Sequence, residues 1–420
     1  MSPIEKLKRR LSELFETNQN KQSNKENKIF RYPNRRLPSL RVDSDSTIPV
    51  RIDNFSILEF TNEFDNFDCD IISIWAMPPF PGINARLNQI LDYIKKNRKD
   101  QNTLTFFDNI YEGHVLGCIR GIHEIINHLN LDHTKVYFFT GGLEAQRIYD
   151  EYCQNKNITQ KINIRVINIW EKSIYYNKDK TEKYIYEIKQ KEKIFLCFNR
   201  NARNHRVAIL GMLYSKNLVD KSYYSFIPEC YHKTLNEVLE LLPSLISPSL
   251  FSEIKKNITL NLDKFPLVLN ISGYNENANY IKETDDIYYK NSYFSLVNET
   301  YFFKVNNDYF DEESVFFSEK IFKPIMCKHP FIQLNRPHAL GYLRKIGYKT
   351  FHPYINESYD TIENDEERLV AIVAEVERLS KQTTEQWIEW QKNVAPVVEH
   401  NYNVIVNRSD KDYYFIKMDN

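Results

Sequence analysis

Short apolar runs alternate with amphipathic stretches over most of the chain beyond residue 51. The runs are apolar at successive positions, which is typical of strands that a parallel sheet buries on both faces. The stretches between them repeat apolar residues every three or four positions, which predicts helices. In the first half, predicted strands cover 69–76, 103–108, 135–142 and 162–170, and predicted helices cover 83–97, 115–130 and 143–155. This alternation predicts an α/β domain over residues 51–190.

A second alternation follows the charged stretch 171–190, which lacks strand character. It opens with a strand, a polar loop and a helix over 193–218. Further predicted strands cover 221–226, 293–302, 329–334 and 348–355, and further helices cover 235–246, a segment starting at Ser318, and 365–380. We therefore predict a second α/β domain over 191–382. Two Rossmann-like domains of this kind are expected to face each other across a cleft, with a ligand at the carboxyl ends of their strands.

The two ends of the chain fall outside these domains. Residues 1–17 place apolar side chains at helical spacing, and 18–50 are polar and contain several prolines. This pattern predicts a basic N-terminal helix and a flexible linker over 1–50, and a helical tail is predicted over 383–420. The basic segment either docks on its own domain or contacts a membrane surface or a partner.

Composition narrows the class of protein. Lys and Arg number 56 and so do Asp and Glu, so no overall basic field attracts nucleic acid. Six cysteines form no C-x-x-C pair, and ten glycines form no Gly-rich phosphate loop, which counts against zinc fingers, Walker-type NTPases and dinucleotide dehydrogenases. No apolar run reaches about 18 residues, so we expect no transmembrane segment. The expected location is cytoplasmic, either free or peripheral at a membrane.

Basic residues gather in the loop FNRNARNHR, which directly follows the apolar run IFLCF. This loop contains Asn199, Arg200, Arg203 and Arg206 at the point where a strand leads into a helix. One guanidinium group can donate two hydrogen bonds to the oxygens of a phosphate, and helix N-termini favour anions. The loop is either an anion-binding site, which we favour, or a solvated helix start with structural ion pairs.

A second polar group lies at the start of the helix in VFFSEKIFKPIMCKHPFIQL, residues 315–334. Ser318 can cap this helix, Glu319 can accept hydrogen bonds from a sugar diol, and Lys320 can pair with a phosphate. Lys323 lies three residues further along and faces the same side. Nucleotide sugars carry both a diol and a diphosphate, so this helix start suits such a ligand. The alternative is an ordinary capped helix without a binding role.

Together these loops resemble the C-terminal domain of the α-1,3-fucosyltransferase family, which has the GT-B fold, over residues from about 193 to 360. The residues that match its Ala-Arg loop and following helix are Ala202, Arg203, Val207 and Leu210. Those that match its Phe-x-Leu-x-Phe-Glu-Asn strand are Phe294, Leu296 and Glu299, with Thr300 in place of Asn. Those that match its Tyr-x-Thr-Glu-Lys motif are Ser318, Glu319 and Lys320, with Phe316 in place of Tyr.

The resemblance implies a hexosyl- or fucosyltransferase that moves a sugar from a nucleotide-diphosphate sugar to a hydroxyl acceptor, with inversion and without a metal or other cofactor. A GDP-fucose-like donor is favoured, although Thr300 and Phe316 leave the sugar open. Arg203 would offset the charge of the leaving diphosphate and is the predicted catalytic cation. The predicted donor-binding residues are Asn199, Arg200, Arg203, Arg206, Glu299, Ser318, Glu319, Lys320 and Lys323.

The first domain would bind the acceptor and supply the general base. Its strand-end loop FFDNIYEGH contains Asp108, Glu112 and His114, of which Glu112 is the predicted base. The pair Gly141-Gly142 ends the next strand and either admits a ligand closely or makes a tight turn.

A second function stays open at this stage: a catalytically inactive GT-B-fold protein that binds a glycan, a nucleotide or a nucleic acid. An acceptor-side base facing the donor site distinguishes the enzyme from the binding protein. The acceptor itself could be a glycan, a lipid-linked sugar, a protein or a nucleic acid.

Overall fold

The computed structural model describes residues 39–42, 71–76, 83–98, 103–110, 112–175, 185–199, 202–230, 233–269, 286–304 and 314–408. These residues form two compact units. The N-terminal unit contains the described residues up to Ile169 together with Lys304 and 314–317. The C-terminal unit contains those from Trp170 to Phe303 and from Ser318 to Arg408. Each unit has its own parallel sheet and helices, so the predicted α/β class is confirmed.

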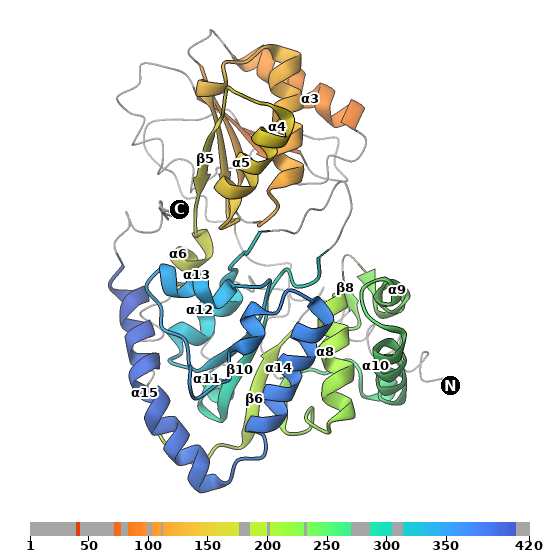
Figure 1. Ribbon diagram of the computed structural model, residues 1–420, viewed down its shortest axis with the longest axis vertical. Coiled ribbons are helices and arrows are strands. Elements are labelled where there is room, and N and C mark those ends of the chain that lie inside the picture. Colours follow the sequence, from red (N-terminus) through yellow and green to blue (C-terminus); the bar gives the residue numbers. More distant parts are fainter. Residues whose placement is uncertain are drawn as a thin grey trace, which may run out of the picture. The chain divides into compact units, whose positions relative to one another are not determined.

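The N-terminal unit is built on a five-stranded sheet whose strands follow one another in chain order, β1-β2-β3-β4-β5. The strands are β1 (Ser39–Val42), β2 (Ile71–Ala76), β3 (Leu104–Asn109), β4 (Val136–Thr140) and β5 (Asn163–Val166), all parallel. The connecting helices are α3 (Ile83–Asn97), α4 (Leu116–Leu129) and α5 (Ala145–Lys156). Because parallel crossovers are right-handed, a sheet in chain order places its helices on one face. Figure 1 shows α3, α4 and α5 together on that face.

The core of this unit lies between these helices and the sheet. Phe107 and Phe138 point to the helices and share one apolar cluster with Ile94, Ile122 and Ile148. The helices end where the chain turns: Asn130 and Asn157 follow α4 and α5 in the left-handed conformation, with φ of 48° and 54°. Asparagine adopts this conformation more readily than most residues, so the sequence itself ends both helices.

A short segment from far along the chain belongs to the same unit. Residues 314–317 lie against the turn after β4. Leu143 N donates to Val315 O at 2.9 Å, and Val315 N donates to Glu144 Oε2 at 3.0 Å. A Cβ added to Gly141 would lie 2.6 Å from Cε2 of Phe316, so the Gly-Gly turn makes room for a side chain of the protein itself.

The C-terminal unit has a four-stranded parallel sheet in the order β11-β10-β6-β7. Its strands are β6 (Lys193–Phe198), β7 (Ser222–Ser225), β10 (Ser292–Asn298) and β11 (Phe331–Leu334), and β8 (Glu229–Cys230) pairs separately with β9 (Lys233–Thr234). The chain runs outward from β6 to β7 on one side and from β10 to β11 on the other. The order therefore reverses between β6 and β10, which is a topological switch point.

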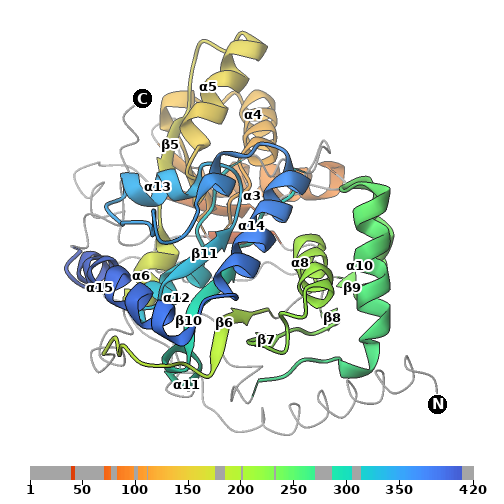
Figure 2. The ribbon, with the colours of Figure 1, turned by 60° about the horizontal axis from the view of Figure 1, so that its bottom comes forward.

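Helices cover both faces of this sheet, with α8 on one face and α12 and α15 on the other (Figure 1). The longer helices are α8 (Asn204–Ser215), α10 (Pro248–Leu260), α12 (Glu319–Met326), α14 (Asp365–Leu379) and α15 (Thr384–Val406). The shorter ones are α6 (Ile169–Tyr175), α9 (Leu235–Leu241), α11 (Asp286–Lys290) and α13 (Ala339–Lys345), and 3-10 turns lie at 242–244, 262–264 and 358–361. A further 3-10 turn, at 133–135, belongs to the N-terminal unit. Helices α8 and α10 pack closely (Figure 2), because Gly211 has no side chain to hold Ile254 away.

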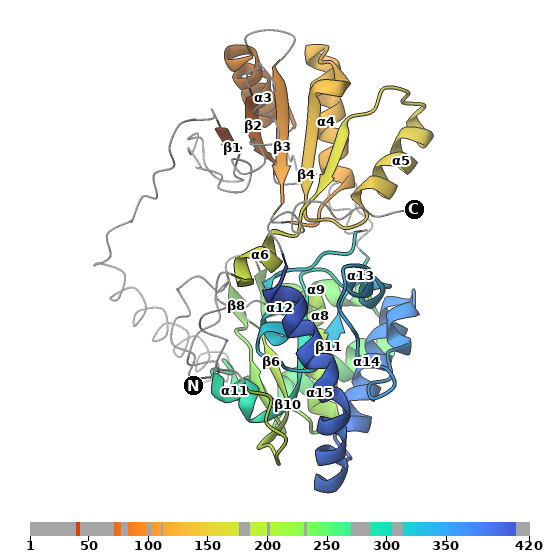
Figure 3. The ribbon, with the colours of Figure 1, turned by 90° about the vertical axis from the view of Figure 1, so that its left-hand side faces the viewer.

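Helix α15 is part of the C-terminal unit, although the sequence places a separate tail over 383–420. It runs beside α12 (Figure 3), and the ring of Trp387 stacks on that of Tyr293 with 4.0 Å between centroids. At its end, Arg408 Nε lies 2.7 Å from Glu171 Oε1, which also accepts from the hydroxyl of Tyr348. Glu171 lies near the start of the unit, so this buried ion pair joins its two ends.

Several expectations differ from the structure. The compact units divide at 169/170 and not at 190/191, because Glu171 contacts the C-terminal unit. Ser39–Val42 pairs with β2, although the sequence predicts a flexible linker there. The predicted strand 348–355 is wrong: its apolar residues are buried, but the backbone follows turns. The predicted N-terminal helix 1–17 lies outside the described residues.

Candidate functional site

The candidate site lies at the carboxyl ends of β6 and β10 in the C-terminal unit. The loop after β6 leads into α8, and the loop after β10 leads through Glu299 and Thr300. Because these two strands are neighbours at the switch point, their following loops diverge to opposite faces. Ligands of open α/β sheets bind in the crevice that such loops leave, and here that position is marked by Arg203, Thr300 and Lys320.

Two predicted phosphate ligands meet at one residue of this crevice. Arg203 Nη1 donates to Thr300 O at 2.8 Å, and Lys320 Nζ lies 3.3 Å from Thr300 Oγ1. Arg203 is half-buried and does not cap α8, whereas 24% of the Lys320 side chain is exposed. Two loops separated by more than a hundred residues thus place two cations around a single threonine. Cations so arranged suit a phosphate group.

The start of α12 is fixed by a buried carboxylate. Ser318 caps the helix, as predicted, and accepts from Lys320 N at 3.3 Å. The hydroxyl of Ser318 donates to Glu299 Oε2 at 2.6 Å, and Glu299 is fully buried. Burial raises the pKa of Glu299, against the opposing effects of Lys320 and the bonds from Ser318. Glu299 and Ser318 therefore position Lys320, whose Nζ also donates to Ser318 Oγ at 2.8 Å.

The first turn of α8 adds two buried basic side chains. Burial lowers the pKa of His205 well below its ordinary value, helped by Arg206 and Arg203, so the imidazole is neutral at pH 7. Its Nε2 lies 2.9 Å from Glu299 O. Burial and the nearby Arg203 lower the pKa of Arg206 to about 10, so this guanidinium stays charged. The buried positive charge makes the crevice favourable for an anion.

Glu319 has a different environment from Glu299. Burial acts to raise its pKa, but Lys320 and Lys323 outweigh this effect and lower the pKa below the ordinary value. Its Oε1 lies 3.4 Å from Lys320 Nζ, and 13% of its side chain is exposed. Glu319 is therefore an ionised acceptor at the mouth of the crevice, which suits a hydroxyl donor such as ribose.

Asn199 lies at the end of β6 and holds strands together. Its Nδ2 donates to Tyr224 Oη at 3.0 Å, and its Oδ1 accepts from Asn298 Nδ2 at 2.9 Å. It is 2% exposed, so the structure gives it a supporting position behind the crevice. Arg200 lies outside the described residues.

Sequence analysis did not identify two arginines near the same loop. Arg336 follows β11, and Arg368 lies in the first turn of α14. Arg368 is 1% exposed, donates to Phe302 O at 3.0 Å and stacks on the Phe302 ring at 4.5 Å. The signal in the sequence was the Asn-Arg pair directly after the strand FIQL, which repeats the arrangement after β6.

The candidate base residues lie at the carboxyl end of β3 in the N-terminal unit. Asp108 is fully buried, and burial raises its pKa to about 7 although Ile110 N donates to it. Glu112 is half-buried, and its backbone oxygen accepts from Gly141 N at 3.2 Å. His114 is half-buried and its backbone oxygen accepts from Asn109. All three therefore lie at or just beyond the carboxyl end of β3.

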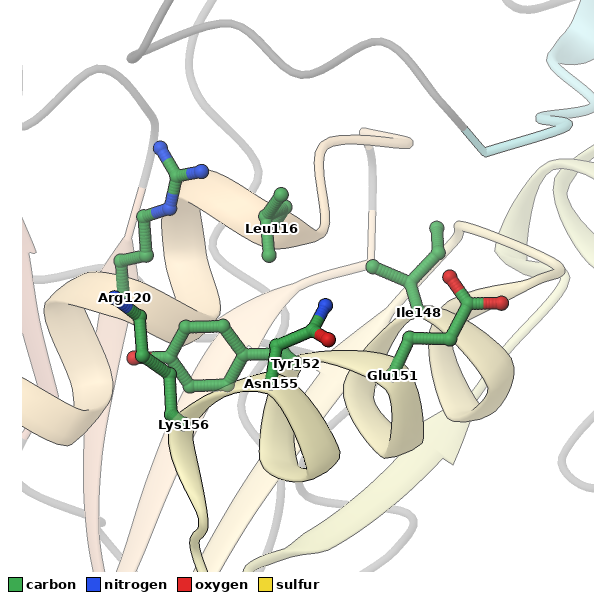
Figure 4. Close-up of a pocket in the computed structure, with 7 residues that line it drawn as sticks. All are labelled: Leu116, Arg120, Ile148, Glu151, Tyr152, Asn155 and Lys156. Carbon is green, nitrogen blue, oxygen red and sulfur yellow. The ribbon is translucent and has the colours of Figure 1, made fainter.

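The N-terminal unit also has an open groove of about 580 Å³ between α4 and α5. Figure 4 shows its lining by Leu116, Arg120, Ile148, Glu151, Tyr152, Asn155 and Lys156. None of the predicted site residues lines it.

Within the described ranges, no three His, Cys, Asp or Glu side chains are grouped closely enough to hold a metal ion. Nor does any described helix have the length and apolar character needed to cross a membrane.

Comparison with known proteins gives a remote likeness in structure. No protein-family model and no curated protein matches the chain. Among solved structures, a UDP-forming α,α-trehalose-phosphate synthase from Burkholderia xenovorans is similar, with a TM-score of 0.40 and 10% sequence identity. The match covers 82% of this chain and 73% of the synthase chain.

Proposed function

We propose that the protein is a glycosyltransferase whose C-terminal unit binds a nucleotide-diphosphate sugar. The observation that carries this proposal is the meeting of Arg203 and Lys320 at Thr300, in the crevice of the switch point. This position suits a phosphate group, and Glu319 beside it suits a ribose diol. The resemblance to the α-1,3-fucosyltransferases, with their GT-B fold, supports the same ligand.

In the proposed reaction, the bond between the sugar and the diphosphate breaks while the acceptor oxygen forms a new bond to the sugar. Negative charge then develops on the leaving nucleoside diphosphate. Arg203 and Lys320 are held by hydrogen bonds and Arg206 is buried in α8 before the ligand arrives, so these cations stabilise the charge with little reorganisation. We assign Arg203 as the catalytic cation, because it is half-buried and comes from the helix N-terminus.

The acceptor hydroxyl must lose a proton, and we assign Glu112 as the general base in an inverting, metal-independent transfer. Burial raises the pKa of Asp108 to about 7, but its side chain is fully buried. A general base must reach the hydroxyl that it deprotonates, which favours the half-buried Glu112. The Gly141–Glu112 hydrogen bond holds the backbone of this residue.

The donor class rests on the resemblance alone. It favours a GDP-sugar of the fucose type. Thr300 presents a short hydroxyl where the family has an amide, so the sugar need not be fucose. The remaining donor contacts are assigned to the half-buried Lys323, with Asn199, Glu299 and Ser318 as supports.

A product-release assay tests this proposal. The full chain is incubated with GDP-, UDP- and CMP-sugars, with and without EDTA and with mixed glycan acceptors, and free nucleotide is measured. Release of one nucleotide that persists in EDTA supports a metal-independent transferase, and Glu112→Gln should slow the release while leaving donor binding intact. Nucleotide binding without release under any condition would instead identify a catalytically inactive binding protein.

A further inference from the structure

Arg336 is a buried cation that the proposed reaction does not use. It follows β11 at the carboxyl edge of the sheet, and only 10% of its side chain is exposed. Its backbone is fixed, since Arg336 N donates to Asn335 Oδ1 at 2.7 Å. The side chain is therefore held at the end of the strand next to β10.

The guanidinium of Arg336 has weak partners. Its Nη1 lies 3.4 Å from Phe302 O and 3.7 Å from Asp365 Oδ1. Both distances are long for a charge-assisted hydrogen bond, which is usually about 2.7–2.9 Å. Its Nε is buried and makes no hydrogen bond with the described residues.

Arg368 occupies the same two acceptors more closely. It donates to Phe302 O at 3.0 Å and forms the shorter ion pair with Asp365 Oδ1. It also donates to Asn335 O and Ile362 O, so its own donors are well used. One carboxylate oxygen thus serves two guanidinium groups, and the pair retains a net positive charge.

Burying a guanidinium is unfavourable unless an anion or strong acceptors compensate for the lost water. Arg368 has such acceptors, whereas Arg336 has only long contacts with two acceptors that Arg368 already uses. Arg336 also contacts Phe302, two residues beyond Thr300, where Arg203 and Lys320 meet. Neighbouring strands lie about 4.8 Å apart, a step that a ligand with two successive phosphates can bridge.

We propose that Arg336 binds the second phosphate of the diphosphate, so that the crevice selects nucleoside diphosphates over monophosphates. The inference rests on the proposed function, because that function places a diphosphate at Thr300. Arg203 and Lys320 then hold one phosphate, and Arg336 exchanges its long contact with Phe302 O for bonds to the other.

Binding of pyrophosphate and orthophosphate to the full chain tests this assignment without any sugar. Wild type should bind pyrophosphate more tightly than orthophosphate. Arg336→Gln should weaken pyrophosphate binding by about tenfold or more, the loss of one charged hydrogen bond, and leave orthophosphate binding nearly unchanged. Arg336→Lys should recover part of the loss. Arg344→Gln is the matched control, since this arginine on α13 is 51% exposed and should leave both affinities unchanged.

Three results would overturn the assignment: no binding of pyrophosphate by wild type, an equal loss for both anions, or no loss for either. Should Arg336→Gln fail to fold, Arg336→Lys carries the comparison, because it keeps the charge but loses the paired donors. The two proposals fail separately. Wild type that binds pyrophosphate selectively but transfers no sugar contradicts only the enzyme, whereas transfer with unchanged pyrophosphate selectivity in Arg336→Gln contradicts only the role of Arg336.

Discussion

Arg203 and Lys320 are separated by more than a hundred residues, yet both donate to Thr300, one to its carbonyl and one to its hydroxyl. The relationship depends on the strand order, since β6 and β10 must be neighbours for the two loops to meet. Ser318 contributes as well, because its hydroxyl oxygen accepts a hydrogen bond from Lys320 Nζ and so positions that side chain. The site is therefore a product of the sheet topology and of one capped helix.

The Glu299–Ser318 bond should support this arrangement energetically. Ser318→Ala leaves a buried carboxylate without its closest donor, and Glu299→Gln removes the charge that the cap and Lys320 compensate. Each change should lower the free energy of unfolding by about 1–3 kcal/mol. In a double-mutant cycle measured by urea denaturation, the two changes together should cost clearly less than their sum. Simple additivity would show that the two groups do not interact.

Asp108 should make the stability of the N-terminal unit depend on pH. Its folded pKa of about 7 lies above the ordinary 3.8, so the folded state holds the proton more tightly than the unfolded state. The stabilisation is complete below about pH 4 and is lost as pH rises through 7. Asp108→Asn should therefore stabilise the protein at pH 8, by at most on the order of 4 kcal/mol, and change little at pH 4.5. Thermal melts of both proteins at the two pH values measure the difference, and an equal effect at both would contradict the buried, protonated carboxyl.

Gly141 should tolerate no side chain. A Cβ there would lie 2.6 Å from Phe316 Cε2 and 2.7 Å from Ile110 O, and the backbone oxygen cannot move aside easily. Gly141→Ala should therefore destabilise the protein by about 1–3 kcal/mol, as overpacking does. Gly341→Ala is the control, because its nearest neighbour lies 3.9 Å away and helix propensity favours alanine. Equal melting temperatures for the two variants would mean that residues 314–317 do not pack on the turn as described.

Periodicity predicted the elements that are long and regular. The helix Ile83–Asn97 and the strands β2, β3, β4, β6 and β10 lie within a few residues of the predicted ranges. Periodicity wrongly predicted a strand over 348–355, where the chain forms buried turns. Tyr348, Phe351 and Ile355 are buried there by tertiary packing and not by strand pairing. Helix α10 was missed, although Ser247 before Pro248 marks its start and Leu250, Ile254 and Ile258 repeat at helical spacing.

The candidate site was predictable in its residue types and less so in their roles. Arginines after a buried strand and a Ser-Glu-Lys helix start indicated the two loops that meet at Thr300. The pattern could not separate ligand-facing groups from supports: Asn199 and Glu299 are buried and bonded to neighbouring strands or caps. Arg336 was missed because its importance depends on the competition with Arg368, which only the folded chain brings beside it.

The central claim is a diphosphate held at Thr300 by two cations, and calorimetric titration of GDP, with UDP and CMP in parallel, tests it most directly. Wild type should bind one of these nucleotides in EDTA. Arg203→Ala and Lys320→Ala should each reduce that affinity by about tenfold or more, since each removes a charge-assisted bond, while Lys345→Ala should not. Full nucleotide affinity in both folded variants would contradict the account.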